Sequence, residues 1–129
     1  MARVDDLFAE LYEVLKAELA ARGIRVRLKE GYRSIARQAD VVRQRGLYTT
    51  GGYAAPPGKS THNYAMGGDV GISPERWDVF GQVAEAVGFR WGGRFTTGKK
   101  EPWHIDLGSF LSINDMRELF DRAYLVEVR

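Results

Sequence analysis

The two histidines of this 129-residue chain both lie close to carboxylates in the sequence. Asp69 follows His62 by seven residues, and Glu101 precedes His104 by three. Two imidazoles and one carboxylate are donors that zinc accepts in open catalytic sites, where a fourth position is left for water. The chain has no Cys, which excludes a thiolate zinc site, a cysteine nucleophile and a disulfide framework. The candidate site is therefore built from His62, Asp69 and His104.

The alternation of side chains along two predicted strands places Asp69 and His104 each on a small, polar face. If residues 66–72 are extended, Asp69 lies between two glycines on one face, and the apolar side chains take the other face. In residues 103–107, His104 and Asp106 share the face opposite the apolar side chains. This pattern predicts two strands that each turn a small, polar face toward one shared site. The alternative is two structural histidines and a surface aspartate, and spacing alone leaves both interpretations open.

Hydrophobic periodicity indicates the elements that must position these residues. The apolar residues from Val4 to Leu19 fall on one helical face, with Asp5 and Asp6 in the first turn and Gly23 beyond the end. Three further helices are predicted: 35–45, capped by Ser34 and ended by Gly46; a helix from Ser73-Pro74 to Gly88; and 113–123, capped by Ser112. Four strands are predicted at 24–29, 66–72, 103–107 and 125–128. Helices and strands mix without regular βαβ alternation, which predicts one α+β domain over residues 1–129 with a mainly antiparallel sheet.

A long connection interrupts this pattern at residues 47–61, which are rich in Gly, Thr, Tyr and Pro. A loop of this length in a small domain is typical of a lid or a substrate wall. Two of its tyrosines, Tyr48 and Tyr53, either line a substrate groove or pack the loop. Tyr64, just after the loop, is expected to pack it.

Charge and hydropathy narrow the classes of partner. Lys and Arg number 19 against 17 Asp and Glu, giving a net charge of +2. The cations are dispersed and no nucleic-acid motif appears, so no nucleic-acid partner is expected. No apolar run approaches the roughly 20 residues of a membrane span, so no membrane insertion is expected. The first residues do not form a secretory signal, which predicts synthesis in the cytoplasm without a signal peptide.

A resemblance to a known family rests on ordered motifs. Ser60-x-His62-x6-Asp69, followed by Glu101-x-x-His104, is similar to the signature of the zinc D-Ala-D-Ala carboxypeptidase family. That family includes vancomycin-resistance peptidases and the L-alanyl-D-glutamate endopeptidases of phage endolysins. Two further stretches resemble it: Gly31-Tyr32-Arg33-Ser34 with Gln38 following, and Trp91-Gly92-Gly93. Two departures are visible: the family's Gly and Ala in the first motif are Ala65 and Gly67 here, and Glu101 stands where many endolysins carry Asp.

The resemblance implies a role for each matching residue. Three residues would bind one zinc ion per chain: His62, Asp69 and His104. Glu101 would be the general base, and Arg33 would steady the carbonyl oxygen and the tetrahedral oxyanion. Ser60 would support the site by hydrogen bonding. Apart from the resemblance, Asp106 is a candidate to orient a zinc ligand from behind, the alternative being a surface acid.

The family's fold and activity follow as expectations. The resemblance implies a small antiparallel sheet that carries the metal, flanked by helices as in the hedgehog and DD-peptidase folds. It implies a zinc peptidase acting as a monomer on the peptidoglycan stem peptide, reaching the cell wall or periplasm after release or delivery. The short chain resembles a compact phage or prophage endolysin, which favours a bacteriolytic L-alanyl-D-glutamate endopeptidase. The alternatives are a D-Ala-D-Ala carboxypeptidase or dipeptidase, and a non-hydrolytic zinc-containing module that binds wall peptides.

Overall fold

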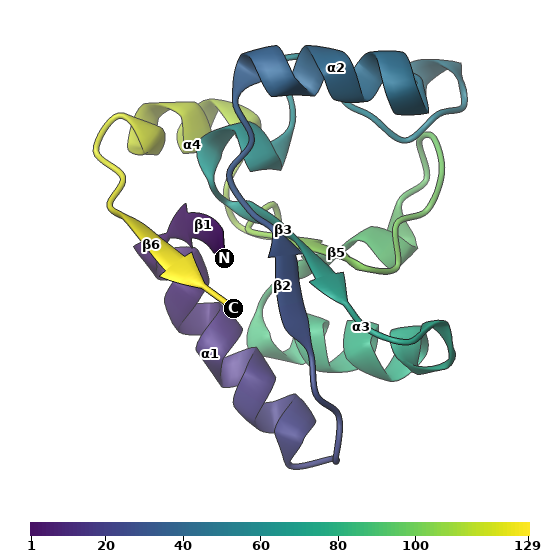
Figure 1. Cartoon of the computed structure of the whole chain (residues 1–129), viewed down its shortest axis with the longest axis vertical. Coiled ribbons are helices and arrows are strands. Elements are labelled where there is room, and N and C mark those ends of the chain that lie inside the picture. The colour runs from purple at the N-terminus through teal and green to yellow at the C-terminus, as the bar shows by residue number, and fades with distance from the viewer.

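Four antiparallel strands form the central sheet of the protein, seen here in a computed structural model that describes residues 1–129 (Figure 1). Their order across the sheet is β2 (Arg27–Glu30), β3 (Gly67–Gly71), β5 (His104–Asp106) and β4 (Arg90–Trp91). A separate antiparallel pair joins the two ends of the chain, β1 (Ala2–Asp5) and β6 (Leu125–Val128). The predicted α+β domain with a mainly antiparallel sheet is confirmed.

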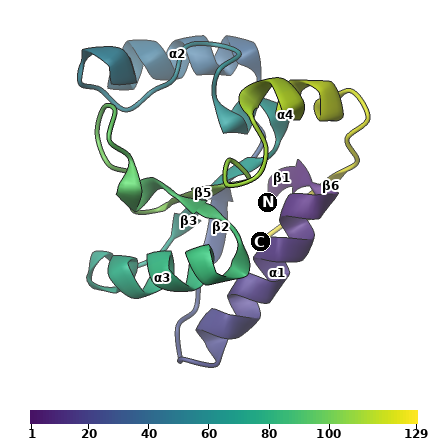
Figure 2. The ribbon, with the colours of Figure 1, turned by 180° about the vertical axis from the view of Figure 1, so that it is seen from behind.

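Four α-helices surround the sheet. They are α1 (Asp6–Ala20), α2 (Ile35–Arg45), α3 (Trp77–Val87) and α4 (Ile113–Phe120). Short 3-10 turns connect the elements: η1 (Tyr48–Thr50), η2 (Thr61–Tyr64), η3 (Pro74–Arg76) and η4 (Gly92–Arg94). The two opposite views show α1 and α3 side by side at one end of the molecule and α2 at the other (Figures 1 and 2). No helix has the length and hydrophobicity that crossing a membrane requires.

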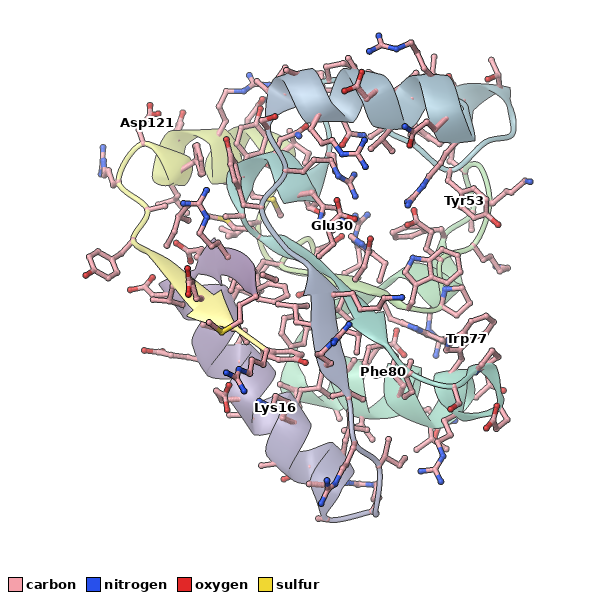
Figure 3. All side chains as sticks on the ribbon, viewed as in Figure 1. Lys16, Glu30, Tyr53, Trp77, Phe80 and Asp121 are labelled. Carbon is pink, nitrogen blue, oxygen red and sulfur yellow. The ribbon has the colours of Figure 1, made fainter.

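The core lies between the sheet and the pair α1 and α3. Phe8 of α1 and Phe80 of α3 are fully buried, and Figure 3 shows Phe80 directed from α3 toward the sheet. The ring of Phe8 packs 5.1 Å from that of Phe89. Gly68 of β3 makes room for this packing, since a Cβ there would lie 2.8 Å from Phe8. The sheet thus gives one face to the core and leaves the other for polar residues.

The caps of α2 follow the sequence prediction closely. The Ser34 side chain accepts a hydrogen bond from the amide of Arg37 and begins the helix. Gly46 ends it with φ of 76°, a left-handed conformation that glycine adopts without steric cost. This helix begins directly after Arg33, so its cap also fixes where that side chain leaves the backbone.

The first predicted helix begins later than its apolar pattern suggested. Val4 belongs to β1, and Asp5 is the N-cap, accepting from the amide of Leu7. Leu7 and Val14, expected on the buried face, are 40% and 50% exposed. The reason is non-local: β1 forms by pairing with β6, more than 110 residues away in the sequence. Local periodicity carries no information about such a partner.

Other boundaries also differ from the prediction, and the strands predicted at 66–72 and 103–107 are each shorter by one residue at both ends. The last helix ends at Phe120 rather than at residue 123. Ser73 makes no cap hydrogen bond, and the 3-10 turn η3 separates it from α3, which begins at Trp77. The strand predicted at 24–29 is observed as β2 over 27–30. The two-residue strand β4 had no prediction at all, because two residues show no periodicity.

Candidate metal centre

Strand register assembles the polar face of the sheet. Asp69 of β3 lies directly opposite His104 of β5. In the adjacent row, Asp106 of β5 lies opposite Gly67 of β3 on one side and Arg90 of β4 on the other. The parity argument from the sequence therefore holds: the carboxylates and His104 share one face, away from the apolar core.

His62 reaches this face from the turn η2. Its backbone amide donates to the Ser60 hydroxyl, which caps the turn. Its Nδ1 lies 2.8 Å from the carbonyl oxygen of Gly31, and because a carbonyl can only accept, Nδ1 carries the proton. Nε2 is then left facing the Oδ1 atom of Asp69 at 3.2 Å. Ser60 supports the turn by a cap hydrogen bond.

Ala65 and Gly67 stand where the family has Gly and Ala, and the structure shows what each position requires. Ala65 has φ of 61°, and it is the one non-glycine residue of the chain in the left-handed region. The turn after η2 thus keeps its left-handed conformation with alanine, at a cost of about 1–2 kcal/mol. Gly67 is needed for space, since a Cβ there would lie 2.1 Å from Oγ1 of Thr61. With the two residues exchanged, Nε2 of His62 lies 3.2 Å from Oδ1 of Asp69.

His104 enters the centre through its other ring nitrogen. Its Nδ1 lies 3.1 Å from Oδ1 of Asp69, and its Nε2 lies 2.7 Å from Oδ2 of Asp106. Ligand atoms of the three candidate zinc residues, His62, Asp69 and His104, all lie within 4.8 Å of one another, and all three residues are buried. The structure therefore brings together the donor set singled out in the sequence, and its chemistry fits a zinc ion.

Charges are strongly coupled in this centre. Burial alone would lower the pKa of His104, but hydrogen bonds to Asp106 and Asp69 outweigh it and raise the pKa to about 10. Burial alone would raise the pKa of Asp69, but the two histidines hold it well below its usual range. Asp106 behaves in the same way, lowered by His104 and Arg90. Both carboxylates are therefore ionised at neutral pH.

Glu101 reaches the centre through a tight turn. The amide of His104 donates to the carbonyl oxygen of Glu101, which closes the turn just before β5. The amide of Glu101 donates to the carbonyl of Gly92, where a Cβ would lie 2.2 Å from the Glu101 oxygen. Burial raises the pKa of the Glu101 carboxyl, although His104 opposes the shift. A carboxylate with a raised pKa is a better proton acceptor near neutral pH.

Arg33 is held in place from two sides. Its Nε donates to Glu30 at 2.8 Å and its Nη1 donates to Gln38 at 2.8 Å. Its Nη2 makes no hydrogen bond and lies 3.8 Å from Oδ2 of Asp69. The side chain is 5% exposed. Its guanidinium is thus fixed beside the candidate metal ligands with one nitrogen still available.

Three residues of this neighbourhood had no role in the sequence prediction. Glu30 fixes Arg33, and Asn63 joins three segments through its amide, donating to the Arg33 carbonyl and accepting from the amides of Gly58 and Ser60. Arg90 pairs with Asp106. Asn63 carried a signal, since it stands three residues after the Ser60 cap as in a capping box. Nothing in the sequence links the other two to the site.

One cavity of about 530 Å³ opens onto this centre. Its lining includes His62, His104, Arg33 and Glu101. The long loop forms one wall, and its Tyr48 and Tyr53 both line the cavity, whereas the hydroxyl of Tyr64 donates to the Gly58 carbonyl and packs the loop.

The segment after η4 adds Phe95, Thr96 and Thr97 to the cavity lining. The segment after η4 meets the long loop where the amide of Lys99 donates to the Gly52 carbonyl (Figure 2).

Comparisons of the sequence and of the fold with known proteins all point to peptidoglycan peptidases. The chain is 29% identical over 115 residues to the peptidoglycan L-alanyl-D-glutamate endopeptidase CwlK of Bacillus subtilis strain 168, covering 74% of this chain and 68% of that protein. Its fold is similar to the vancomycin-resistance D,D-pentapeptidase VanY solved with Zn(II), with a TM-score of 0.67, 18% identity, and 92% of this chain and 78% of the other covered.

A second solved structure and a family model complete the comparison. The Serratia marcescens L-Ala D-Glu endopeptidase ChiX matches with a TM-score of 0.53 and 24% identity, covering 77% of this chain and 78% of that one. Residues 2–108 match the model of the VanY family, described as D-alanyl-D-alanine carboxypeptidase. The match spans most of the domain, from β1 to the end of the strand that carries His104 and Asp106. The chain therefore belongs to the VanY family of peptidoglycan peptidases.

Proposed function

We propose that the protein is a zinc-dependent peptidase that hydrolyses the L-alanyl-D-glutamate bond of the peptidoglycan stem. The observation that carries this proposal is the convergence of Glu101 and Arg33 with the three-residue donor set on a single cavity. Two of the similar proteins, CwlK and ChiX, are L-alanyl-D-glutamate endopeptidases, which supports the choice of bond.

Zinc would be held by Nε2 of His62, a carboxylate oxygen of Asp69 and Nδ1 of His104. These three atoms fit, because each histidine already directs its other nitrogen to an acceptor outside the centre. The similar VanY structure contains Zn(II). When bound, zinc lowers the pKa of a water molecule to about 7 and polarises the substrate carbonyl.

Glu101 is the proton carrier in this proposal. Its carboxylate accepts a proton from the water whose oxygen attacks the carbonyl carbon. The carbon–nitrogen bond then breaks, and Glu101 returns the proton to the departing amine nitrogen. Burial raises the pKa of the carboxyl, which suits both the acceptance and the return of a proton near neutral pH.

Arg33 stabilises the negative charge that develops on the carbonyl oxygen. Glu30 and Gln38 occupy its Nε and Nη1, so Nη2 is the nitrogen directed to the substrate. A cation held in place before the reaction stabilises the oxyanion without reorganising during the step.

The cavity walls favour a peptide that carries carboxylates. Arg45 of α2 and Lys59 of the long loop line the cavity, and neither forms an ion pair with a carboxylate of the chain. A stem peptide containing D-glutamate presents such a group. These two cations would therefore attract the substrate and hold it along the wall.

The second candidate is D-Ala-D-Ala carboxypeptidase activity. The matching family model has this description, and the similar VanYB has been solved with D-Ala-D-Ala. The same wall cations would bind a terminal carboxylate. A non-hydrolytic binding module is disfavoured, because it needs neither the half-buried Glu101 nor a fixed Arg33.

Digestion of defined muropeptides distinguishes these functions. The protein is incubated with disaccharide pentapeptide, with and without a chelator, and the products are identified by mass spectrometry. Endopeptidase activity releases a peptide that begins with D-glutamate, whereas carboxypeptidase activity releases free D-alanine. Cleavage that persists after complete zinc removal would contradict zinc dependence, and the absence of any cleavage with zinc bound would favour the binding module.

A further inference from the structure

Arg90, on the edge strand β4, forms a two-pronged contact with a buried carboxylate. Its Nε donates to Oδ1 of Asp106 at 2.9 Å, and its Nη2 donates to Oδ2 at 2.7 Å. Asp106 is completely buried, whereas the Arg90 side chain is 47% exposed. This is the parallel, bidentate geometry in which arginine holds a carboxylate most rigidly.

The same carboxylate holds His104. Oδ2 of Asp106 lies 2.7 Å from Nε2 of His104, and Oδ1 accepts from the amide of Gly108 at 2.8 Å. Since an ionised carboxylate only accepts, Nε2 carries the proton and donates to it. Nδ1 of His104 is thereby turned toward Asp69 and the candidate metal centre.

Packing around the arginine keeps it in this position. The guanidinium carbon lies 4.8 Å from the centre of the Phe95 ring, and that ring lies 5.6 Å from the ring of His104. A Cβ at Gly108 would lie 2.7 Å from both Nε of Arg90 and Oδ1 of Asp106. The absence of a side chain at Gly108 therefore leaves the space that the bidentate contact occupies.

We propose that Arg90 is a positioning residue of the metal centre: through Asp106 it fixes the orientation of His104, so that Nδ1 is ready to bind zinc. The proposal rests on the proposed zinc function. Half-exposed ion pairs usually contribute little to stability. This pair differs because the Asp106 carboxylate has no exposure and also holds His104, a candidate metal ligand, by a hydrogen bond. The effect of Arg90 is therefore expected on zinc affinity more than on folding.

The chain contains a matched control for this proposal. Arg94 forms the same bidentate contact with Glu85, at 2.7 and 2.9 Å, and lines the same cavity. Neither Arg94 nor Glu85 contacts Asp106 or a candidate zinc ligand. The variants Arg90→Gln and Arg94→Gln each remove one arginine fork near the site, but only the first disturbs the support of His104.

Zinc affinity is measured by competition with a chromophoric chelator. We expect Arg90→Gln to bind zinc about 10-fold more weakly than the wild type, the lower end of the range for groups behind a metal ligand. Arg90→Lys keeps the charge but loses the fork, and should fall between the two. Arg94→Gln should match the wild type. Full recovery in Arg90→Lys would show that charge alone matters and would overturn the positioning role.

A second readout does not depend on zinc. In metal-free protein, the imidazole N–H resonances of His104 and His62 are observed by 15N-edited NMR. Arg90→Gln should shift the His104 Nε2–H signal and speed its exchange with water, while the His62 Nδ1–H signal, bonded to Gly31, stays unchanged. If Arg90→Gln does not fold, Arg90→Lys carries the same comparison.

The two proposals fail separately. A wild-type protein that binds no zinc contradicts the zinc function, yet the NMR comparison still tests the link from Arg90 to His104. An unchanged His104 signal together with unchanged zinc affinity in a folded Arg90→Gln variant overturns the positioning role alone.

Discussion

The two histidines face the centre through different ring nitrogens, and each is fixed by an acceptor on its far side. The Gly31 carbonyl holds Nδ1 of His62, and the Asp106 carboxylate holds Nε2 of His104. A backbone carbonyl and a buried carboxylate therefore each orient one imidazole ring. Both rings are oriented by the protein before any metal arrives, which lowers the cost of ordering them on binding.

The role of Glu101 is tested by Glu101→Gln. The amide keeps the size and polarity of the side chain but accepts no proton near neutral pH. We expect a folded, zinc-loaded protein whose rate of muropeptide cleavage falls by roughly 10²–10⁴-fold, the usual contribution of a positioned acid–base group. Zinc content, thermal melting and cleavage are measured on one preparation.

Glu85→Gln is the matched control for that experiment. Glu85 also lines the cavity, but its carboxylate is occupied by Arg94. Its variant should retain cleavage near the wild-type rate. Activity that survives in zinc-loaded Glu101→Gln would assign the proton transfer to another group, and loss of zinc would make Glu101 a ligand or the support of one.

The geometry of Arg33 predicts that its charge alone is insufficient. Lysine at this position cannot reach Glu30, Gln38 and the substrate at once, because it carries one nitrogen rather than a fork. We expect Arg33→Lys to lower kcat by on the order of a hundredfold or more, the usual effect of removing an oxyanion donor. Arg37→Lys, on the exposed face of α2, is the control, and equal kcat for both variants would return Arg33 to a structural role.

At the scale of elements, the sequence predicts what is local. The alternation around Asp69 and His104 showed which side chains share a face, and Ser34 and Gly46 marked both ends of α2. Pairing partners were out of reach, since register depends on contacts between strands far apart in the sequence. For that reason Arg90 was missed: its importance comes from lying opposite Asp106.

The exchanged positions in the first motif give a prediction for β3. In Gly67→Ala the new methyl would collide with Thr61, whose Oγ1 is 2.1 Å from the Cβ position. Since Thr61 begins the turn that carries His62, we expect a loss of about 1–3 kcal/mol in unfolding free energy, typical of overpacking, and weaker zinc binding. Denaturant unfolding and chelator competition measure the two effects.

Gly71→Ala is the control on the same strand and the same face. Its Cβ would lie 3.0 Å from the flexible side chain of Lys29, which can move aside, and 3.5 Å from the Arg27 carbonyl oxygen, an ordinary van der Waals contact. We expect it to keep zinc affinity and most of its stability. Equal effects of the two substitutions would mean that the space at Gly67 does not matter to the site.

At the scale of the whole molecule, the chain ends brace the site. Strand β1 is held by β6, and its Arg3 carbonyl accepts from the amide of Tyr32. The amide of Asp5 donates to the Ala65 carbonyl. These two contacts support the segments that precede Arg33 and follow His62. The sequence predicted only the second strand of this terminal pair. Through these two hydrogen bonds, the pair supports the segments that carry Arg33 and His62.

Charge in the metal centre links zinc binding to the stability of the whole fold. In metal-free protein the pKa of His104 is raised to about 10, against about 6.5 when unfolded. The folded protein therefore holds an extra proton between these values, so this contribution to stability is complete below pH 6.5 and is lost as the pH rises toward 10. Zinc bound at Nδ1, as proposed, would take the place of that proton.

It follows that the stabilisation by zinc should grow with pH. Melting temperatures are measured with saturating zinc and with chelator at pH 6, 7 and 8, in buffers that do not bind the metal. We expect the difference between the two melting temperatures to increase at each step, because zinc binding releases a proton and the concentration of competing protons falls as the pH rises. Calorimetric titration in buffers of different ionisation enthalpy should detect about one proton released from His104 per zinc. The contrary result is a zinc-induced shift that stays constant over this range, with no proton released. It would mean that His104 is already neutral in the metal-free protein, and that Asp69 and Asp106 do not keep its imidazole protonated.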